Sequence, residues 1–388
     1  MSVTAASGFR ASGVAAGLKA SGASDVALVV NDGPLHVAAA VFTSNRFKAA
    51  PVLWSQQVLQ TGSLRAVVLN SGGANACTGA GGFQDTHQTA ELVAALLTES
   101  GVDTGAGEIG VCSTGLIGER LPMERLAAGV EAAFGGLTAE GGLDAARAIM
   151  TTDTVPKLAL FDSGGYCIGG MAKGAGMLAP ALATMLVVIT TDAVLTAAQA
   201  DESLREATAR SFDRIDSDGC MSTNDTVLLL SSGASGVSPD PREFAQALTE
   251  VCANLARQLI ADAEGASKDI AIVVEAAATL DDALEVARAI ARSNLLKCAL
   301  HGEDPNWGRV LSAVGTTNAR FDPDRVDVAM NGIWICRGGS IGDPRTLVNL
   351  GSREIEIRVS LDAGDASATV WTNDLTAEYV HENSAYAT

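Results

Sequence analysis

One threonine stands where a small-residue stretch meets an apolar run. Residues 169–183 are rich in glycine and alanine, and Thr184 begins a run that stays almost wholly apolar to Ile189. A threonine hydroxyl becomes a useful nucleophile when a base lies beside it, and a free α-amino group on the same residue supplies one. Cleavage between Ala183 and Thr184 would create that arrangement. The simpler interpretation is that Thr184 only begins a core strand, where threonine is common.

Two further segments carry groups that could assist such a nucleophile. Thr114 and Gly115 follow a strand-like segment, and a hydroxyl beside a backbone N–H can form two convergent donors for a developing oxyanion. An ordinary strand-to-loop turn explains the same residues. Near the C-terminus, residues 382–388 offer amide and hydroxyl groups that could close over a small zwitterionic substrate. A frayed tail is the alternative there.

Several familiar kinds of site are absent from the sequence. It contains no His-Glu-x-x-His, no Gly-x-x-x-x-Gly-Lys-Ser/Thr and no Gly-x-Ser-x-Gly. Its four histidines lie far apart, without metal-ligand spacing. The glycines at 72–73 and 79–82 lack the ordered fingerprint of a nucleotide site, so a turn with close packing is the better interpretation.

Composition and charge narrow the class of partner. The 388 residues are 47% hydrophobic and 18% charged, which predicts a folded protein with a sizeable core. A net charge of −19 argues against binding to nucleic acid and to anionic lipid. There is neither a basic patch with an apolar region at the N-terminus nor a membrane-spanning run. Seven scattered cysteines without a Cys-x-x-Cys pair predict a reducing cytoplasm.

Short strands and longer helices must position these residues. Helices are predicted over 86–100, over 242–262, and from a capping pair at Thr279 and Asp282 to about Leu296. The stretch 169–183 is predicted to be a loop that leads into a buried strand. Alternation of the two element types predicts α+β or α/β layers. Short runs rich in valine and isoleucine predict strands at 26–30, 37–42, 66–69, 109–112, 158–161, 185–190, 226–230, 270–274, 326–330, 355–359 and 368–371.

Eight segments taken together resemble one known family. They include Leu-Asn-Ser-Gly-Gly-Ala-Asn-Ala-Cys-Thr-Gly at 69–79, Cys-Ser-Thr-Gly-Leu-Ile-Gly at 112–118, Met-Thr-Thr-Asp-Thr at 150–154, Ser-Thr-Asn-Asp-Thr at 222–226 and Glu-Asn-Ser-Ala-Tyr at 382–386. The others are 8–14, 173–186 and Asp-Pro-Asn-Trp-Gly-Arg at 304–309. In their order along the chain, these segments resemble the ornithine acetyltransferases, the ArgJ-type glutamate N-acetyltransferases of arginine biosynthesis. Small departures, such as Ala175 where many members have serine, remove no reacting group.

The resemblance implies a fold and a processing event. The implied fold is α+β with a layered αββα arrangement, similar to ArgJ, DmpA and other N-terminal-nucleophile proteins, and a second, smaller α/β region. Members cut themselves between the residues that match Ala183 and Thr184. The α chain would then be 1–183 and the β chain 184–388, and the two generally form an α2β2 heterotetramer.

The resemblance also implies a reaction and its residues. Thr184 would take the acetyl group from N²-acetylornithine and pass it to glutamate by double displacement, with Thr114 and Gly115 as the oxyanion hole. Lys173 would pair with the substrate carboxylate and Glu264 with the ornithine ammonium. No metal or bound cofactor is required, although some members also use acetyl-CoA as a donor. The implied substrate-binding residues are Thr151, Lys173, Thr184, Glu264, Asn383 and Thr388.

Two other classes of function remain open from the sequence. One is a self-processing aminopeptidase or amidase with the same nucleophile, in which water rather than glutamate accepts the acyl group. The other is an uncleaved metabolite-binding protein. The mass of the denatured chain separates the second from both enzymes, because only the enzymes would give two fragments.

Overall fold

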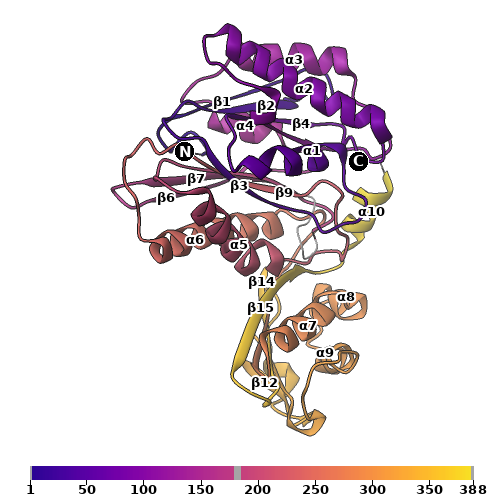
Figure 1. The fold of residues 1–388 in the computed structure, drawn as a ribbon. Coiled ribbons are helices and arrows are strands. Elements are labelled where there is room, and N and C mark those ends of the chain that lie inside the picture. Colours follow the sequence, from indigo (N-terminus) through magenta and orange to yellow (C-terminus); the bar gives the residue numbers. More distant parts are fainter. Residues whose placement is uncertain (1, 179–184, 386–388) are drawn as a thin grey trace.

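The computed structural model describes residues 2–178 and 185–385, and these form two lobes (Figure 1). The first lobe contains two sheets. One has the order β1-β2-β4-β5, with β1 (Phe9–Val14), β2 (Val26–Asn31), β4 (Ala66–Ser71) and β5 (Ile109–Thr114). The other has the order β3-β9-β8-β7-β6, with β3 (Val37–Phe42), β9 (Thr226–Ser231), β8 (Leu186–Thr191), β7 (Cys167–Lys173) and β6 (Lys157–Asp162).

Helices cover the outer faces of both sheets. The first sheet lies under α2 (Gly79–Glu99) and α3 (Met123–Gly135), and the second lies over α5 (Ala197–Arg210) and α6 (Pro241–Ala261) (Figure 1). Two short helices contact both sheets from the space between them, α1 (Ala50–Val58) and α4 (Gly142–Ala148). The αββα layering that the resemblance implies is therefore confirmed.

Strand β8 lies in the middle of the second sheet and is buried along its whole length. It pairs antiparallel with β7, where Lys173 is opposite Leu186, and parallel with β9, where Leu186 is opposite Thr226. Such continuous apolar burial is expected of a strand covered on both faces. The connection that contains residues 183 and 184 therefore leaves one strand and enters its direct neighbour.

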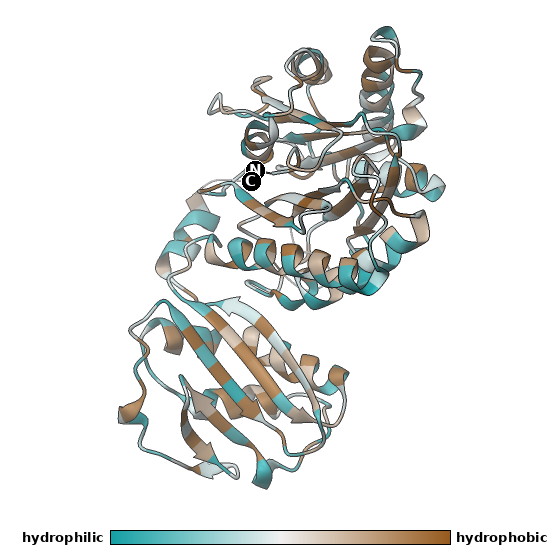
Figure 2. Ribbon diagram, turned by 90° about the vertical axis from the view of Figure 1, so that its left-hand side faces the viewer, coloured by the Kyte–Doolittle hydropathy of each residue, from teal (hydrophilic) through white to brown (hydrophobic). Residues whose placement is uncertain are grey.

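The second lobe is a six-stranded sheet with helices on one face. Its strand order is β13-β12-β11-β14-β10-β15. Along β10 (Asp269–Ala277), buried and half-buried residues alternate, which is typical of a sheet covered on one side. Figure 2 shows the same alternation as bands of hydrophobic and hydrophilic residues on the strands. The other elements are α7 (Leu280–Ala291), α8 (Asn294–His301), α9 (Trp307–Val314), β11 (Asp327–Met330), β12 (Ile333–Arg337), β13 (Ser340–Ile341), β14 (Glu354–Ser360) and β15 (Ala366–Asn373).

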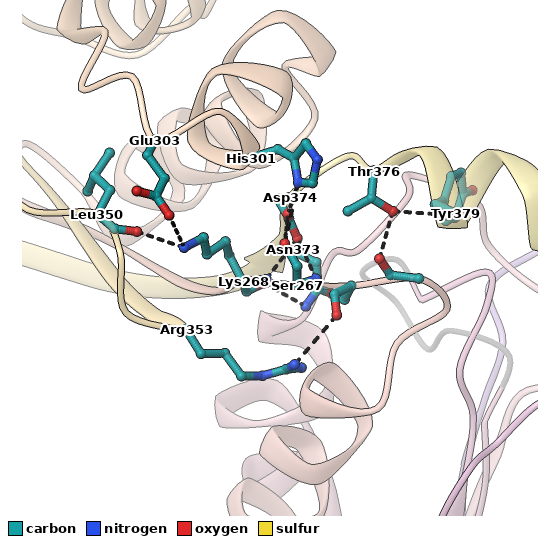
Figure 3. Close-up of polar contacts among 12 residues, drawn as sticks. Ser267, Lys268, His301, Glu303, Leu350, Arg353, Asn373, Asp374, Thr376 and Tyr379 are labelled. Carbon is teal, nitrogen blue, oxygen red and sulfur yellow. Dashed lines mark hydrogen bonds and ion pairs between the residues drawn. The ribbon is translucent and has the colours of Figure 1, made fainter.

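The chain enters and leaves the second lobe at one place, which polar contacts hold together (Figure 3). Asp374 follows β15, and its carboxylate accepts hydrogen bonds from the backbone N–H groups of Ser267 and Lys268, both at 2.9 Å. The Ser267 hydroxyl donates to the same carboxylate at 2.5 Å, and His301 Nδ1 lies 2.9 Å from it. From this junction α10 (Ala377–Ala385) returns to the first lobe (Figure 1).

Two local expectations and one alternative are wrong. The glycine-rich stretch 169–183 is not loop throughout, because its first residues belong to β7. The helix predicted from Thr279 to Leu296 is two helices, and Ser293 caps the second through its side chain. The C-terminal segment is not frayed up to Ala385, because α10 includes Asn383. The Thr279 cap is confirmed, since its side chain accepts a hydrogen bond from the Asp282 N–H.

Candidate active site

Thr114 is the last residue of β5, and Gly115 follows it directly. Thr114 is 2% exposed, and its backbone oxygen accepts a hydrogen bond of 3.0 Å from the Gly73 N–H. Gly115 has φ of 128°, and a Cβ built there would lie 2.6 Å from the Gly73 nitrogen. Only glycine fits so close to that backbone. The tight turn thus holds the Thr114 hydroxyl and the Gly115 backbone in one fixed arrangement.

The ammonium group of Lys173 contacts the Thr114 hydroxyl. Lys173 ends β7, is 1% exposed, and its Nζ donates to Thr114 Oγ1 at 3.2 Å. Burial lowers the pKa of Lys173, and the nearby carboxylate of Asp153 opposes that effect. A hydroxyl that accepts from an ammonium keeps its own proton for another acceptor. Thr114 is therefore arranged to donate a hydrogen bond.

A buried ionic cluster fixes the turn that carries Thr151. The Asp153 carboxylate accepts from the Thr151 N–H at 2.9 Å and from the Gly174 N–H at 2.7 Å, and it pairs with Lys157 at 2.5 Å. Lys157 is fully buried and also pairs with Asp262. Burial by itself would raise the pKa of Asp153, but the charges of Lys173 and Lys157 outweigh it and lower the pKa. The cluster ties this turn to the end of β7.

Glu264 lies in the turn after α6, and hydrogen bonds hold both of its carboxylate oxygens. Thr152 Oγ1 donates to one oxygen at 2.7 Å, and Asn383 Nδ2, from α10, donates to the other at 2.9 Å. The Glu264 N–H donates to the Ala175 carbonyl at 2.9 Å. A Cβ at Gly176 would lie 2.6 Å from the same carboxylate, so the absence of a side chain there makes room for it.

One polar pocket collects these side chains and encloses about 410 Å³, including its open mouth. It contains an ammonium, a carboxylate, hydroxyls and an amide, which suits a small ligand that carries both charges. Within residues 2–178 and 185–385, no group of His, Cys, Asp and Glu side chains is placed to hold a metal. The pocket is lined by Thr114, Gly115, Thr151, Thr152, Lys173, Gly176, Met177, Glu264 and Asn383.

The pocket brings together every predicted site residue that the structure describes, namely Thr114, Gly115, Thr151, Lys173, Glu264 and Asn383. The predicted cleavage pair Ala183 and Thr184 and the predicted ligand Thr388 lie outside the described residues. Met185, which follows Thr184 directly and comes immediately before β8, is buried.

Sequence reasoning missed three lining residues. Gly176 and Met177 lie in the stretch before the predicted cleavage bond, and Thr152 is the neighbour of Thr151. The signal for Thr152 was present, because it belongs to the Met-Thr-Thr-Asp-Thr motif. What the sequence lacks is the pairing of Thr152 with Glu264, which is 112 residues away.

A larger hollow lies elsewhere and contains none of these residues. It encloses about 1010 Å³ beside the second lobe and includes Arg257, Asp269, Glu354 and Trp371 in its lining. Among the described residues that line it, none is a serine, threonine or cysteine that could act as a nucleophile. Among the described residues, no helix combines the length and the apolar character needed to cross a bilayer.

Comparisons with known proteins give matches along nearly the whole chain. The model of the ArgJ family matches residues 10–388. The chain is 66% identical over 388 residues to the arginine biosynthesis bifunctional protein ArgJ of Thermobifida fusca, with complete coverage of both chains. It is 65% identical over 387 residues to the protein of that name from Streptomyces coelicolor, again with complete coverage.

A solved structure is also similar in sequence. A chain of ornithine acetyltransferase from Mycobacterium tuberculosis, crystallised with ornithine, is 61% identical and covers 48% of this chain and 96% of its own length, with a TM-score of 0.46. The match of the family model and the identity to full-length relatives together show that this chain belongs to the ArgJ family.

Proposed function

We propose that this protein is a glutamate N-acetyltransferase of arginine biosynthesis that works in the cytoplasm. It moves the acetyl group of N²-acetylornithine to glutamate and releases ornithine. The observation that carries the proposal is the pocket in which Lys173 contacts Thr114 while Glu264 lies on the same lining. Family membership supports it, as does the ornithine acetyltransferase named among its similar structures.

The proposed reaction has two acyl transfers through Thr184. Its free amine takes the hydroxyl proton while Oγ attacks the acetyl carbonyl, and the proton then passes to the departing ornithine nitrogen. The glutamate nitrogen then attacks the acetyl-Thr184 ester, the bond from the carbonyl carbon to Oγ breaks, and the proton lost by that nitrogen passes through the Thr184 amine to Oγ. In both steps the carbonyl oxygen becomes negative, and the Thr114 hydroxyl and the Gly115 N–H stabilise that charge.

The charged groups of the pocket support an assignment of the two ends of the substrate. The Glu264 carboxylate, held by Thr152 and Asn383, receives the side-chain ammonium of ornithine. Lys173 attracts the substrate carboxylate as well as orienting Thr114. Thr151 and Asn383 contribute hydrogen bonds to the bound amino acid, and Thr388 completes this set. We propose acetyl-CoA as a second donor of the acetyl group on the basis of the resemblance alone.

The amine exists only after cleavage between Ala183 and Thr184, so the proposal includes that processing. The fragments 1–183 and 184–388 would then share one sheet, because β6 and β7 belong to the first fragment and β8 and β9 to the second. This interleaving supports fragments that stay together as α and β chains, and their α2β2 assembly is proposed from the resemblance alone.

The test is to incubate the purified protein with acetylornithine and to measure the masses of the denatured chains. We expect two fragments divided at 183/184, with the second heavier by one acetyl group, and loss of that group when glutamate is added. Thr184→Ala should give one intact chain without transfer. Rapid release of free acetate in place of transfer would indicate the amidase, and an intact wild-type chain would indicate a binding protein.

A further inference from the structure

Self-cleavage needs a base that the mature mechanism does not supply. In the uncleaved chain the Thr184 nitrogen is part of a planar amide, and its electron pair is shared with the carbonyl. It cannot accept the hydroxyl proton as a free amine does. Another group must therefore accept that proton the first time, if the proposed function and its processing step hold.

Asp225 is buried next to the start of the segment that follows the cleavage bond. It is 0% exposed and directly precedes β9, and its Oδ1 accepts a hydrogen bond of 3.0 Å from the Met185 N–H. The parallel pairing of Leu186 with Thr226 sets the two segments side by side. The Met185 nitrogen is the atom bonded to the carbonyl carbon of residue 184, so Asp225 lies within one peptide unit of Thr184.

The second oxygen of this carboxylate is not used by the described part of the chain. Asp225 Oδ2 is buried and accepts no hydrogen bond of good geometry from residues 2–178 or 185–385. A buried polar atom without a partner is costly and therefore rare. The hydroxyls of Ser222 and Thr43 lie near this carboxylate without such a bond to Oδ2, so this oxygen is suited to taking a proton.

The surroundings of Asp225 favour proton uptake. Burial raises the pKa of Asp225 well above its usual range, and the Met185 N–H, the Lys173 charge and the hydroxyls of Ser222 and Thr43 only partly oppose this. A raised pKa makes a carboxylate a stronger base, which is what removal of a hydroxyl proton requires.

The residue before Asp225 links the same place to the oxyanion strand. Asn224 Nδ2 donates to the Ser113 carbonyl at 2.8 Å and to the Ala74 carbonyl at 2.6 Å. Ser113 immediately precedes Thr114 on β5. Asn224 and Asp225 therefore join the strand that carries Thr114 to the segment that follows Thr184.

We propose that Asp225 is the base of self-cleavage. It accepts the Thr184 hydroxyl proton as Oγ bonds to the Ala183 carbonyl carbon. The bond from that carbon to the Thr184 nitrogen then breaks, and Asp225 returns the proton to this nitrogen. The products are a free amine and an ester, and one water molecule hydrolyses the ester to free the carboxylate of Ala183. The proton is conserved and the carboxylate ends as it began.

Asp192 provides a matched control in the same sheet. It follows the other end of β8 and is 5% exposed. Both of its oxygens are satisfied, by the Cys167 N–H at 2.8 Å and the Ser7 N–H at 3.0 Å. Asp192→Asn thus removes a buried, amide-bonded carboxylate far along the strand from the cleavage bond.

The experiment follows cleavage of full-length chains made in a short cell-free pulse, by denaturing mass measurement over time. Asp225→Asn should keep the intact mass, with cleavage slowed by roughly 10²-fold or more. Asp192→Asn should be cleaved at the wild-type rate. Circular dichroism of the intact variant should match that of Thr184→Ala, which shows that a folded chain has failed to cut itself.

The outcomes separate this inference from the proposed function. Cleavage of Asp225→Asn at the wild-type rate would overturn the role of Asp225 while leaving the transferase intact. A wild-type chain that never divides would instead overturn the proposed function.

If Asp225→Asn does not fold, the pH dependence of wild-type cleavage decides. The rate should fall as the pH drops through the pKa of a base that is faced by Lys173 of β7 and by the hydroxyls of Ser222 and Thr43. A rate that stays constant with pH would overturn the inference.

Discussion

At the scale of single residues, the contact between Lys173 and Thr114 is the main electrostatic feature of the pocket. An ammonium that is 1% exposed is expensive to bury, and its Nζ is 3.2 Å from a hydroxyl rather than at the surface. The charge therefore polarises the Thr114 hydroxyl, which is the donor that we propose for the reacting carbonyl. Lys173 and Thr114 act as one unit in this arrangement, and changes to either should be strongly non-additive.

Thr114→Val removes the hydroxyl and keeps the shape of the side chain. We expect kcat for acetyl transfer to fall by roughly 10²–10³-fold, because one oxyanion donor is lost. Steady-state kinetics with acetylornithine and glutamate measures this. Thr190→Val is the control. It removes a buried hydroxyl of β8 that donates a hydrogen bond to the Val3 carbonyl, and it should leave kcat unchanged. Equal kcat values for Thr114→Val and wild type would exclude an oxyanion role.

Glu264→Gln removes the negative charge while keeping the size of the side chain. The expected result is a KM for acetylornithine raised by roughly 10- to 100-fold, since a charge-assisted hydrogen bond contributes about 1.5–3 kcal/mol. The KM for glutamate should change less. Glu303→Gln is the control, because its carboxylate pairs with Lys268 in the second lobe. An unaltered KM for acetylornithine would argue against contact with the ammonium.

Thr114, Gly115 and the segment 382–388 could be singled out from residue type and position, but the other described residues of the site could be predicted only through the family motifs. Taken alone, Glu264 is a carboxylate near the end of a helix, and Asn383 belongs to a terminal segment. The spacing of residues 152, 264 and 383 in the sequence does not predict that their side chains are in contact. Two helices and the junction determine how far apart these residues lie in space. Asp225 belongs to the Ser-Thr-Asn-Asp-Thr motif, but packing, which the sequence does not reveal, leaves its Oδ2 without a partner among the described residues.

At the scale of elements, strand β7 shows why part of the fold escaped the sequence. Its glycines lower the strand signal, and each of them makes room for a neighbour. A Cβ at Gly169 would lie 2.1 Å from the Ser2 carbonyl oxygen, and one at Gly170 would lie 3.0 Å from Leu255 Cδ1. Strands β3 and β8 contain no glycine and carry β-branched residues, so the sequence predicts them as strands.

The junction between the lobes should make stability depend on acid pH. Burial alone would raise the pKa of Asp374, but hydrogen bonds from Ser267, Lys268 and His301 outweigh it and lower the pKa. A carboxylate with a lowered folded-state pKa stabilises the fold above its unfolded pKa of about 3.9. That contribution is lost as the pH falls through the folded value.

Asp374→Asn tests this element. Urea unfolding at pH values between about 3 and 7 should show a smaller loss of stability toward acid in the variant than in the wild type. The variant should also be less stable at pH 7, where the charge is present. Asp201→Asn, which changes an exposed carboxylate paired with Arg205 on α5, should follow the wild-type curve. Parallel curves for Asp374→Asn and wild type would remove the junction from this role.

At the scale of the whole molecule, the two proposed fragments are woven into the same sheet. The order β3-β9-β8-β7-β6 places strands of 184–388 between strands of 1–183. Each fragment alone would leave long unpaired strand edges and an open core. The cleaved protein should therefore unfold as one cooperative unit rather than as two.

Hydrogen exchange measured by mass spectrometry checks this expectation. Amides of β7 and β8 should exchange at similar rates in cleaved wild type, and at the same rates in uncleaved Thr184→Ala. The reason is that the pairs from Ile168 with Thr191 to Lys173 with Leu186 hold both strands in one ladder. Much faster exchange of β7 after cleavage would show that the fragments separate locally.

Two chain segments connect the second lobe to the first, and these two segments are hydrogen-bonded neighbours. Asp269 at the start of β10 pairs with Asn373 at the end of β15, and Glu264 and Asn383 lie just outside this pair along the chain. Whatever the remainder of that lobe becomes through insertion, deletion or sequence drift, its two ends stay pinned a single strand spacing apart. Changes within residues 269–373 can therefore leave the contact of Glu264 with Asn383, on the lining of the pocket, undisturbed.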